Sequence, residues 1–509
     1  MRSNPPGLLL KATIFLLAAT DNLQSGMTAF AAGPIMGETG VTPEDFSLIA
    51  AVYASVAILV ISMQRWFVER LGGRPFVQLC AAVSVIGSVL CATSHDFSSF
   101  LAGRIVMAVG GGAFFTCARM IIQHLLAGPR ILGGIRSIAS GVATGIAVAP
   151  WAASVAVSLE TWSAIYWLVA SLGAVAFVLA SLTLSPEPLG TATNRSDPGL
   201  LGQTVLVFGS FLLLYSLQRF YYDFYGDVAL AALALGAAVL GLTMYLRFQY
   251  RAAHPLLRVR EVLHVRYLAG IALFAFAYAM LGANNYMVPL MLQRTLGYSW
   301  ETVGHFQALS LAVAVITVLV LLQVMPRAPA PQKFLVTGLV SLTIFGFLLT
   351  RINSGANLWF DILPALAFNS VFLMTVMPTT AMQTFRGLEK DEALFSNAQQ
   401  LKNMLAQAGV ALGITLATLG QQWRTAVHYS TLNAQINPAN PFFTATLRHL
   451  QETLTAAVGP VQAARIATAQ VAQMVYQQSS MLANIDHFTV IAALGTLGVL
   501  VTLVQRVFR

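Results

Sequence analysis

Few ionisable side chains interrupt the long apolar runs of this 509-residue chain, and three of them stand out. Asp21 stands in the first run, Arg104 in the fourth and Lys402 in the thirteenth. A charge inside an apolar run of membrane-spanning length is costly, so such residues face a cavity or an opposite charge and mark functional sites. A carboxylate removed from water holds a proton more readily, and a nearby arginine reverses that effect. Asp21, with Arg104 as its partner, is therefore the leading candidate for proton exchange.

Each of these charges also has a plain structural interpretation. Asp21 could be a buried acid that only makes hydrogen bonds. Lys402 could bind an anionic substrate or balance an acid, or its long stem could carry the ammonium group to the membrane interface. For Arg119, lower in the fourth run, we expect an interfacial or loop-tethering position, and for His305 ordinary packing.

Several amide and aromatic side chains inside the runs could line a ligand cavity. A large apolar pocket with a few polar groups suits amphiphilic molecules. Ordinary helix packing remains the better interpretation for any single aromatic or methionine residue nearby. The candidate lining residues are Gln24, Asn284, Asn285, Tyr286, Asn369, Gln400 and Lys402.

The composition is that of a protein with many membrane spans. Hydrophobic residues make up 57% of the chain and charged residues 9%, and the mean hydropathy is +0.73. Runs of about twenty apolar residues are long enough to cross a bilayer as helices. An even number of them places both termini on one side. The sequence contains fourteen, near 9–31, 45–66, 75–94, 98–123, 132–156, 162–185, 200–220, 228–248, 267–290, 302–325, 333–351, 357–382, 394–419 and 487–507.

Basic residues gather in alternate loops. With the amino terminus in the cytoplasm, most arginines and lysines fall on the cytoplasmic face, as expected for an inner-membrane protein with both termini inside. This asymmetry accounts for the formal net charge of +9. A nucleic-acid partner is therefore not needed to explain the charge.

Residue types that would indicate other chemistry are sparse. The three cysteines, Cys80, Cys91 and Cys117, all fall inside apolar runs, so we expect neither a disulfide framework nor a metal site. No HExxH, GxSxG or Walker-type motif points to an enzyme. We also expect no cofactor, and the first run continues into further spans, which favours a retained helix over a cleaved signal.

The order of the runs predicts an all-α polytopic fold in three parts. Residues 1–185 form an amino-terminal six-helix bundle, 186–260 a linker with two inserted helices, and 261–509 a carboxyl-terminal six-helix bundle. A polar segment at about 421–486 carries Leu447, Leu450 and Leu454 at helical spacing, which predicts an amphipathic helix on the non-cytoplasmic side. This segment is either a cap on the last two helices or a docking surface.

Small residues recur at every fourth position of the fifth run. Such a stripe lets another helix backbone approach closely, so we expect a helix-packing seam there. The stripe consists of Gly133, Ser137, Gly141, Gly145, Ala149 and Ala153.

Three motifs resemble those of the major facilitator superfamily. The loop QRWFVERLGGRPF between runs two and three resembles its signature loop, through Glu69, Arg70, Gly72 and Arg74. The fourth run resembles its arginine-plus-glycine pattern, with Arg104 followed by three consecutive glycines at 110–112. The fifth run, through Gly145 and Pro150, resembles its antiporter pattern.

The number of runs and the carboxyl half resemble the fourteen-span drug:proton antiporters, in particular the EmrB-type multidrug efflux subunit. The family's acid in the first helix lies one turn nearer the following proline than Asp21 does. The resemblance implies two six-helix bundles with two inserted helices, alternating access, and proton-driven export of hydrophobic or amphiphilic compounds. It also implies a periplasmic adaptor and an outer-membrane channel as partners. The alternative is an exporter dedicated to one endogenous metabolite, such as a fatty acid, siderophore or aromatic acid.

Overall fold

The computed structural model describes residues 7–126, 130–159, 161–185, 199–222, 226–252, 255, 257–262, 264–325, 327, 330–388 and 392–508. Within these ranges every regular element is a helix. The all-α fold is therefore confirmed. Most of the predicted linker at 186–198 lies outside the described residues.

Thirteen helical stretches of the described chain are long and apolar enough to span a bilayer. The helix α1, which carries Lys11 and Asp21, is not among these thirteen stretches; it packs along α7 in the bundle. The amino-terminal half comprises α1 (Gly7–Phe30), the short α2 (Ala32–Thr39), α3 (Pro43–Leu71), α4 (Gly73–Ala92), α5 (Phe97–Gly111), α6 (Phe114–Leu125), α7 (Arg130–Ser158) and α8 (Ala164–Thr183). The helices α5 and α6 follow one another as a single span.

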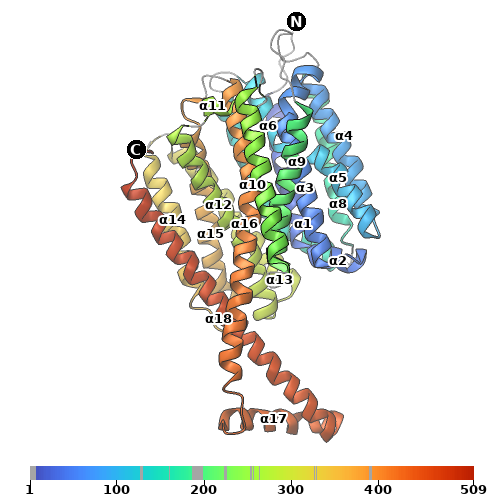
Figure 1. Cartoon of the computed structure of the whole chain (residues 1–509), viewed down its shortest axis with the longest axis vertical. Helices are drawn as coiled ribbons and strands as arrows, with labels where there is room; N and C mark the ends of the chain where they lie inside the picture. Colours follow the sequence, from blue (N-terminus) through green and yellow to red (C-terminus); the bar gives the residue numbers. More distant parts are fainter. Residues whose placement is uncertain are drawn as a thin grey trace.

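The remaining elements form the inserted pair and the carboxyl-terminal half. The pair is α9 (Leu200–Tyr222) and α10 (Val228–Arg251), followed by the short α11 (Val259–Val262). The carboxyl-terminal half comprises α12 (Val265–Leu290), η1 (Met291–Thr295), α13 (Trp300–Val324), α14 (Pro331–Leu349), η2 (Leu358–Ile362), α15 (Leu363–Thr384), α16 (Glu392–Asn433), α17 (Pro441–Val458) and α18 (Pro460–Val504). Both termini lie at the same end of the bundle, called here the terminal end (Figure 1).

The small-residue stripe of α7 packs against α1, as its spacing predicts. A Cβ atom on Gly141 would stand 2.5 Å from the carbonyl oxygen of Phe15. One on Gly145 would stand 2.4 Å from the carbonyl oxygen of Ala19. Because these neighbours are backbone atoms, the seam has no room for a larger residue, and the predicted packing role is confirmed.

The charged loop between α3 and α4 is a single residue long. Gly72 joins the two helices with φ at 90°, a conformation that side chains disfavour. Arg65 Nε lies 2.6 Å from Glu69 Oε1, and the guanidinium of Arg70 lies 4.3 Å from the ring centroid of Trp66. The turn is therefore tight and its charges are held by the end of α3.

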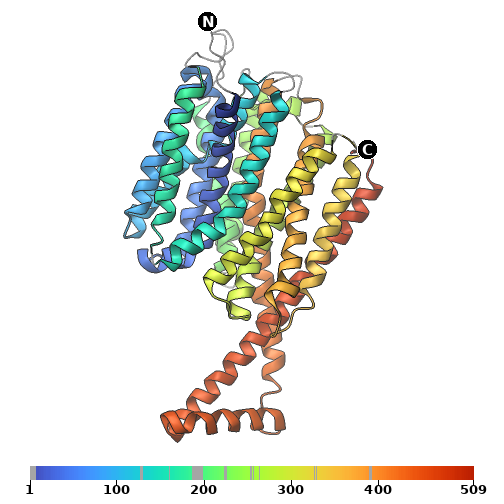
Figure 2. The same cartoon turned by 180° about the vertical axis from the view of Figure 1, so that it is seen from behind.

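The polar segment at 421–486 is not a separate loop. The helices α16 and α18 run straight out of the bundle at the far end, opposite the termini, and α17 closes them into a helical hairpin (Figures 1 and 2). At 1.5 Å per residue the 42 residues of α16 and the 45 of α18 extend roughly 63 and 68 Å, about twice the apolar thickness of a bilayer.

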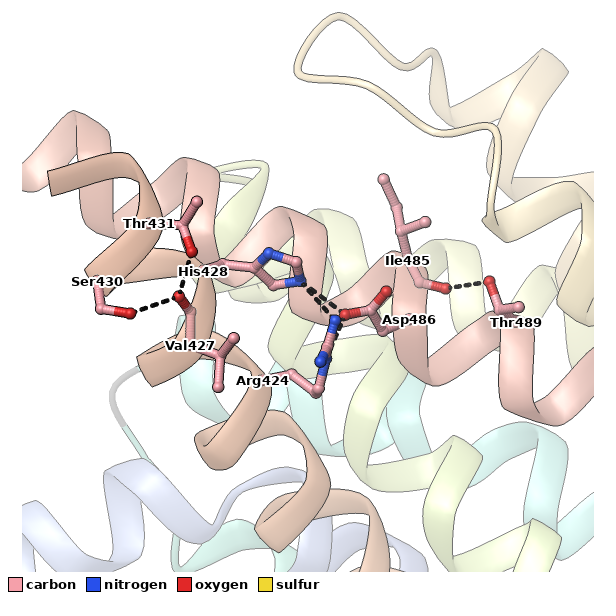
Figure 3. A network of polar contacts seen from close by, with 8 residues as sticks. All are labelled: Arg424, Val427, His428, Ser430, Thr431, Ile485, Asp486 and Thr489. Atoms are coloured by element: carbon pink, nitrogen blue, oxygen red, sulfur yellow. Dashed lines mark hydrogen bonds and ion pairs between the residues drawn. The ribbon is translucent and has the colours of Figure 1, made fainter. Parts of the chain in front are cut away.

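A polar network holds the base of this hairpin (Figure 3). Asp486 Oδ2 of α18 lies 2.6 Å from Arg424 Nε and 2.6 Å from His428 Nε2, both on α16. The same two helices make a further contact, in which Gln421 Nε2 donates to Ser480 Oγ at 3.3 Å. The two long helices are therefore tied together where they leave the bundle.

The predicted apolar stripe of α17 is only partly available to a partner. Leu447, Leu450 and Leu454 are half-buried, because α17 folds back on α18. The most exposed large apolar side chains near the tip are instead Phe442, at 83% exposed, and Val461, at 70%. The three leucines thus serve the hairpin's own packing, which favours the cap interpretation for these residues.

Candidate functional site

The polar residues between the two halves lie at similar depth. The helices α1, α12 and α16 all begin at the terminal end, and each rises 1.5 Å per residue. Asp21, Tyr278 and Lys402 therefore stand roughly 21, 20 and 15 Å along their helices, near the middle of an apolar core about 30 Å thick. A half-membrane depth is where a transport site open to either side must lie.

Lys402 occupies an aromatic pocket built by both halves. Its Nζ lies 5.3 Å from the ring centroid of Phe115 on α6, and 5.4 and 5.7 Å from those of Phe274 and Tyr278 on α12. Nζ also donates to the hydroxyl of Tyr278 at 3.3 Å. Asp21, on the opposite half, attracts Lys402 electrostatically. Lys402 is 7% exposed, so its ammonium group is buried and does not reach the membrane interface.

Arg119 belongs to this same cluster, contrary to the expectation of an interfacial position. It repels Lys402 and interacts electrostatically with Tyr278. Its guanidinium lies 5.1 Å from the ring centroid of Phe395 on α16. Because α6 belongs to one half and α16 to the other, this contact joins the halves on the terminal side of Asp21. The hydropathy of the fourth run locates the span but does not predict which way the side chain of Arg119 faces.

Arg104 lies elsewhere, inside the amino-terminal half. It is 5% exposed, and its guanidinium lies 4.1 Å from the ring centroid of Tyr53. Its NH1 lies 3.5 Å from the sulfur of Met107, and Nε has no hydrogen-bond partner among the described residues. Tyr53 interacts electrostatically with both Arg104 and Asp21, and Gln24 donates to its hydroxyl at 2.9 Å. Tyr53 thus stands where direct pairing of Asp21 with Arg104 was predicted.

Asp21 lies on a partly exposed face of α1. Asp21, Ser25 and Ala29 follow one another at the spacing of one helical turn; Asp21 is half-buried, and Ser25 and Ala29 are exposed. Asp21 on this face attracts Lys402, which belongs to the other half.

The other predicted lining residues have three kinds of environment. Asn284 on α12 donates to Asn369 on α15 at 2.8 Å, and both are buried. Gln400 on α16 donates to the carbonyl of Ile61 on α3 at 3.1 Å, which joins the halves. Asn285 is exposed and Tyr286 is half-buried.

A further buried amide, Asn397, was not predicted. It is 0% exposed, and neither its oxygen nor its nitrogen has a hydrogen-bond partner among the described residues. It stands on α16 five positions before Lys402. An unsatisfied buried amide is unfavourable, so it marks a position for water or a ligand group. In the sequence nothing distinguishes it from the nearby amides Gln399 and Gln400.

At the far end the two halves pack closely. A Cβ atom on Gly304 of α13 would stand 2.5 Å from Cβ of Ser154 and 3.0 Å from the carbonyl oxygen of Pro150, both on α7. The rings of Phe30 on α1 and Trp300 on α13 meet edge to face at 5.6 Å. The site is therefore covered on the far side by contacts between the halves.

Comparison with known proteins identifies the fold family. Residues 14–414 match the Major Facilitator Superfamily. The chain belongs to the major facilitator superfamily. It is therefore a multi-pass membrane transporter and not an enzyme, and the observed pair of helical halves is the arrangement of that superfamily.

Similar proteins include several resistance transporters. The chain is 23% identical over 452 residues to the uncharacterized MFS-type transporter YhcA of Bacillus subtilis, covering 86% of this chain and 81% of that one. It is 21% identical to the putative multidrug resistance protein MdtD of Escherichia coli, covering 76% and 80% of the two chains. The methylenomycin A resistance protein of Bacillus subtilis is 27% identical over 57% of this chain and 62% of its own length.

Solved structures of transporters share the fold. A POT family transporter in complex with a thioalcohol-conjugated peptide superposes with a TM-score of 0.58 at 15% identity, covering 97% of this chain and 95% of that one. The nucleoside transporter NupG superposes with a TM-score of 0.52 at 11% identity, covering 96% and 99%. At these identities the likeness concerns the fold alone.

Proposed function

We propose that this transporter exports hydrophobic or amphiphilic compounds across the bacterial inner membrane in exchange for protons, and that Asp21 carries the proton. The observation that carries the proposal is the position of Asp21. It is a half-buried acid near the middle of α1, and its electrostatic partner, Lys402, belongs to the other half. The multidrug and methylenomycin resistance proteins among the similar sequences support export as the direction.

The arrangement suggests how proton occupancy biases the two halves. Ionised Asp21 attracts Lys402 and draws α1 toward α16. A proton on Asp21 removes that attraction and leaves Lys402 facing Arg119, which repels it. Because a ligand or proton shifts a two-state equilibrium only through its different free energy in the two states, a group at the interface is suited to this role.

Arg104 acts through Tyr53 in this proposal. The guanidinium fixes the ring of Tyr53, and Tyr53 in turn accepts the hydrogen bond from Gln24, one turn from Asp21 on α1. Arg104 is thus a positioning residue for the wall beside Asp21, while Asp21 exchanges the proton.

The hydrophobic body of a substrate would lie among the aromatic rings of the cluster. Phe115, Phe274 and Tyr278 surround Lys402, and Asp21 of α1 attracts Lys402 from the other half. Such a surface is apolar with few polar groups, which suits amphiphilic compounds of varied shape.

We also propose that both termini are cytoplasmic and that the hairpin of α16, α17 and α18 stands in the periplasm. Basic side chains at the terminal end, including Arg65, Arg70 and Arg74, support this orientation through the positive-inside rule. In this orientation the hairpin would meet a periplasmic adaptor, which would continue to an outer-membrane channel.

Replacement of Asp21 tests the coupling. Asp21→Asn keeps the shape but cannot exchange a proton, so gradient-driven uptake of ethidium into inverted vesicles should be lost while the protein stays folded. Asp96→Asn is the matched control, because Asp96 caps α5 through the backbone N–H of Ser99 at 2.7 Å and asparagine caps equally well. Undiminished gradient-driven uptake by Asp21→Asn would exclude Asp21 from coupling.

A further inference from the structure

The inserted helix α9 lies in the seam between the two halves. In Figure 1 it stands beside α3 of the amino-terminal half, and α10 runs along it. It contacts both α3 and α16 of the carboxyl-terminal half. One apolar cluster combines Ala51 and Ala54 of α3, Leu214 and Leu217 of α9, and Ala411 of α16. The insert therefore covers this lateral boundary between the halves.

The polar contacts of α9 are distributed unequally. Toward α3, Ser47 donates to Gln218 at 2.8 Å, and Ser62 donates to Gln203 at 2.8 Å in a buried position. Arg219 pairs with Glu44 of α3 at 3.2 Å. The contacts run from Glu44 to Ser62, about 27 Å along α3 at the rise of a helix, which is nearly the full apolar thickness of a bilayer.

Toward α16, by contrast, the contacts are a hydrogen bond to the backbone and apolar packing. Thr415 donates to the carbonyl oxygen of Leu217 at 2.7 Å. Leu206 of α9 belongs to an apolar cluster against which the partly buried Leu401 and Met404 of α16 pack. Apolar contacts have no preferred direction, so they permit sliding, whereas a row of side-chain hydrogen bonds fixes register.

We propose that α9 is a fixed part of the amino-terminal half and a sliding seal against α16, which keeps this side of the molecule closed to lipid while the halves move. The proposal rests on the proposed function only in taking transport to require motion of one half against the other. The position of α9 in the sequence, between the two halves, does not predict to which half it is attached.

Cross-linking of two adjacent positions on α9 tests the asymmetry. In a background with Cys80, Cys91 and Cys117 replaced by serine, Ser47→Cys with Gln218→Cys joins α9 to α3. Thr415→Cys with Leu217→Cys joins α9 to α16 at the same depth. The same short bifunctional thiosulfonate spans both pairs, and ethidium transport in proteoliposomes is measured before linking, after linking and after reduction.

The α3 link should leave transport within about twofold, and the α16 link should lower it by more than about tenfold, since it blocks the motion of one half. Reduction should restore both. Equal loss with both links, or no loss with the α16 link, would overturn the proposal. Absence of gradient-driven transport before linking would count against the proposed function instead.

A distance measurement tests the same proposal without transport. Spin labels at the two cysteine pairs, in lipid nanodiscs, should give one narrow distance for α9 and α3 and a broader or double distribution for α9 and α16. A distribution for α9 and α3 that is as broad as that for α9 and α16 would contradict a fixed attachment to the amino-terminal half.

Discussion

Arg104 and Lys402 are two cations with nearly equal burial, at 5% and 7% exposed, but their neighbours differ. Arg104 contacts Tyr53 of α3 and Met107 of its own helix, all within the amino-terminal half. Lys402 is surrounded by α6 of one half and α12 of its own. A motion of one half against the other would leave the first environment intact and would change the second. Under the proposed function, the depth of a buried charge in the membrane does not reveal its role, whereas the half to which its neighbours belong does.

The largest expected effect is the loss of transport when Lys402 is replaced. Lys402→Met keeps the length of the side chain but removes the attraction to Asp21, so transport should fall between about 5-fold and 150-fold, the range of a coupling free energy of 1–3 kcal/mol. Thermal stability of the purified protein should change little, because methionine packs well among aromatic rings. Ethidium transport in proteoliposomes is the measurement.

Arg104→Met is the matched variant. It removes a buried cation that has no acidic partner among the described residues, so unfolding stability should be unchanged or raised. Transport should fall less than about fivefold, an effect below the usual range of coupling energies, because only the orientation of Tyr53 is disturbed. A greater loss of transport in Arg104→Met than in Lys402→Met would reverse the comparison.

Gly145 and Gly304 compare a close contact within one half with a close contact between the two halves. Gly145→Ala forces a Cβ atom to 2.4 Å from a backbone oxygen of α1 within one half. It should therefore lower unfolding stability by about 1–3 kcal/mol. Gly304→Ala places a Cβ atom 2.5 Å from Ser154 between the halves, and the halves can relieve the clash by separating at the far end.

Gly304→Ala should therefore increase labelling of Ser25→Cys by an impermeant maleimide from the far side, with little loss of stability. Gly236→Ala is the control, since a Cβ atom there meets nothing within 4 Å. If Gly145→Ala raised this labelling as much as Gly304→Ala, the distinction between contacts within and between the halves would fail.

The smallest effect is expected at the base of the hairpin. Asp486→Asn weakens the pairing with Arg424 and His428, and because these side chains are partly exposed the loss of stability should not exceed about 1 kcal/mol. If the hairpin meets an adaptor, whole-cell efflux should fall while proteoliposome transport stays normal. A parallel decrease of both would show that the network supports the bundle itself.

The sequence predicted the spans closely, because hydropathy is a local property that adds up along the chain. The run at 228–248 corresponds to α10 (Val228–Arg251), and that at 45–66 to α3 (Pro43–Leu71). The spacing of small residues through Gly141 and Gly145 is also a local feature of the sequence. It predicted a helix-packing seam, and the structure shows that α1 is the partner.

The partners of the charges were less predictable, because they depend on how separate helices rotate and meet. Asp21 stands one turn from the position of the family's acid, and the structure relates it to Lys402 and Tyr53, with Arg104 behind Tyr53. Arg119 resembled an interfacial residue by sequence and faces the centre instead. For the segment at 421–486 the sequence predicted an amphipathic helix, which α17 provides, but not that α16 and α18 continue from the bundle into it, because both helices turn polar where they leave the apolar core.

The unbroken course of α16 and α18 from the bundle into the hairpin has a mechanical consequence. A helix without a break transmits rotation as a rod, so any tilt of the half that contains these helices also swings the tip. Over the roughly 30 Å that twenty helical residues span, a tilt of about 10° displaces the tip by about 5 Å. A protein bound there would be pulled once in each transport cycle, so the hairpin converts a rearrangement inside the membrane into a periodic stroke outside it.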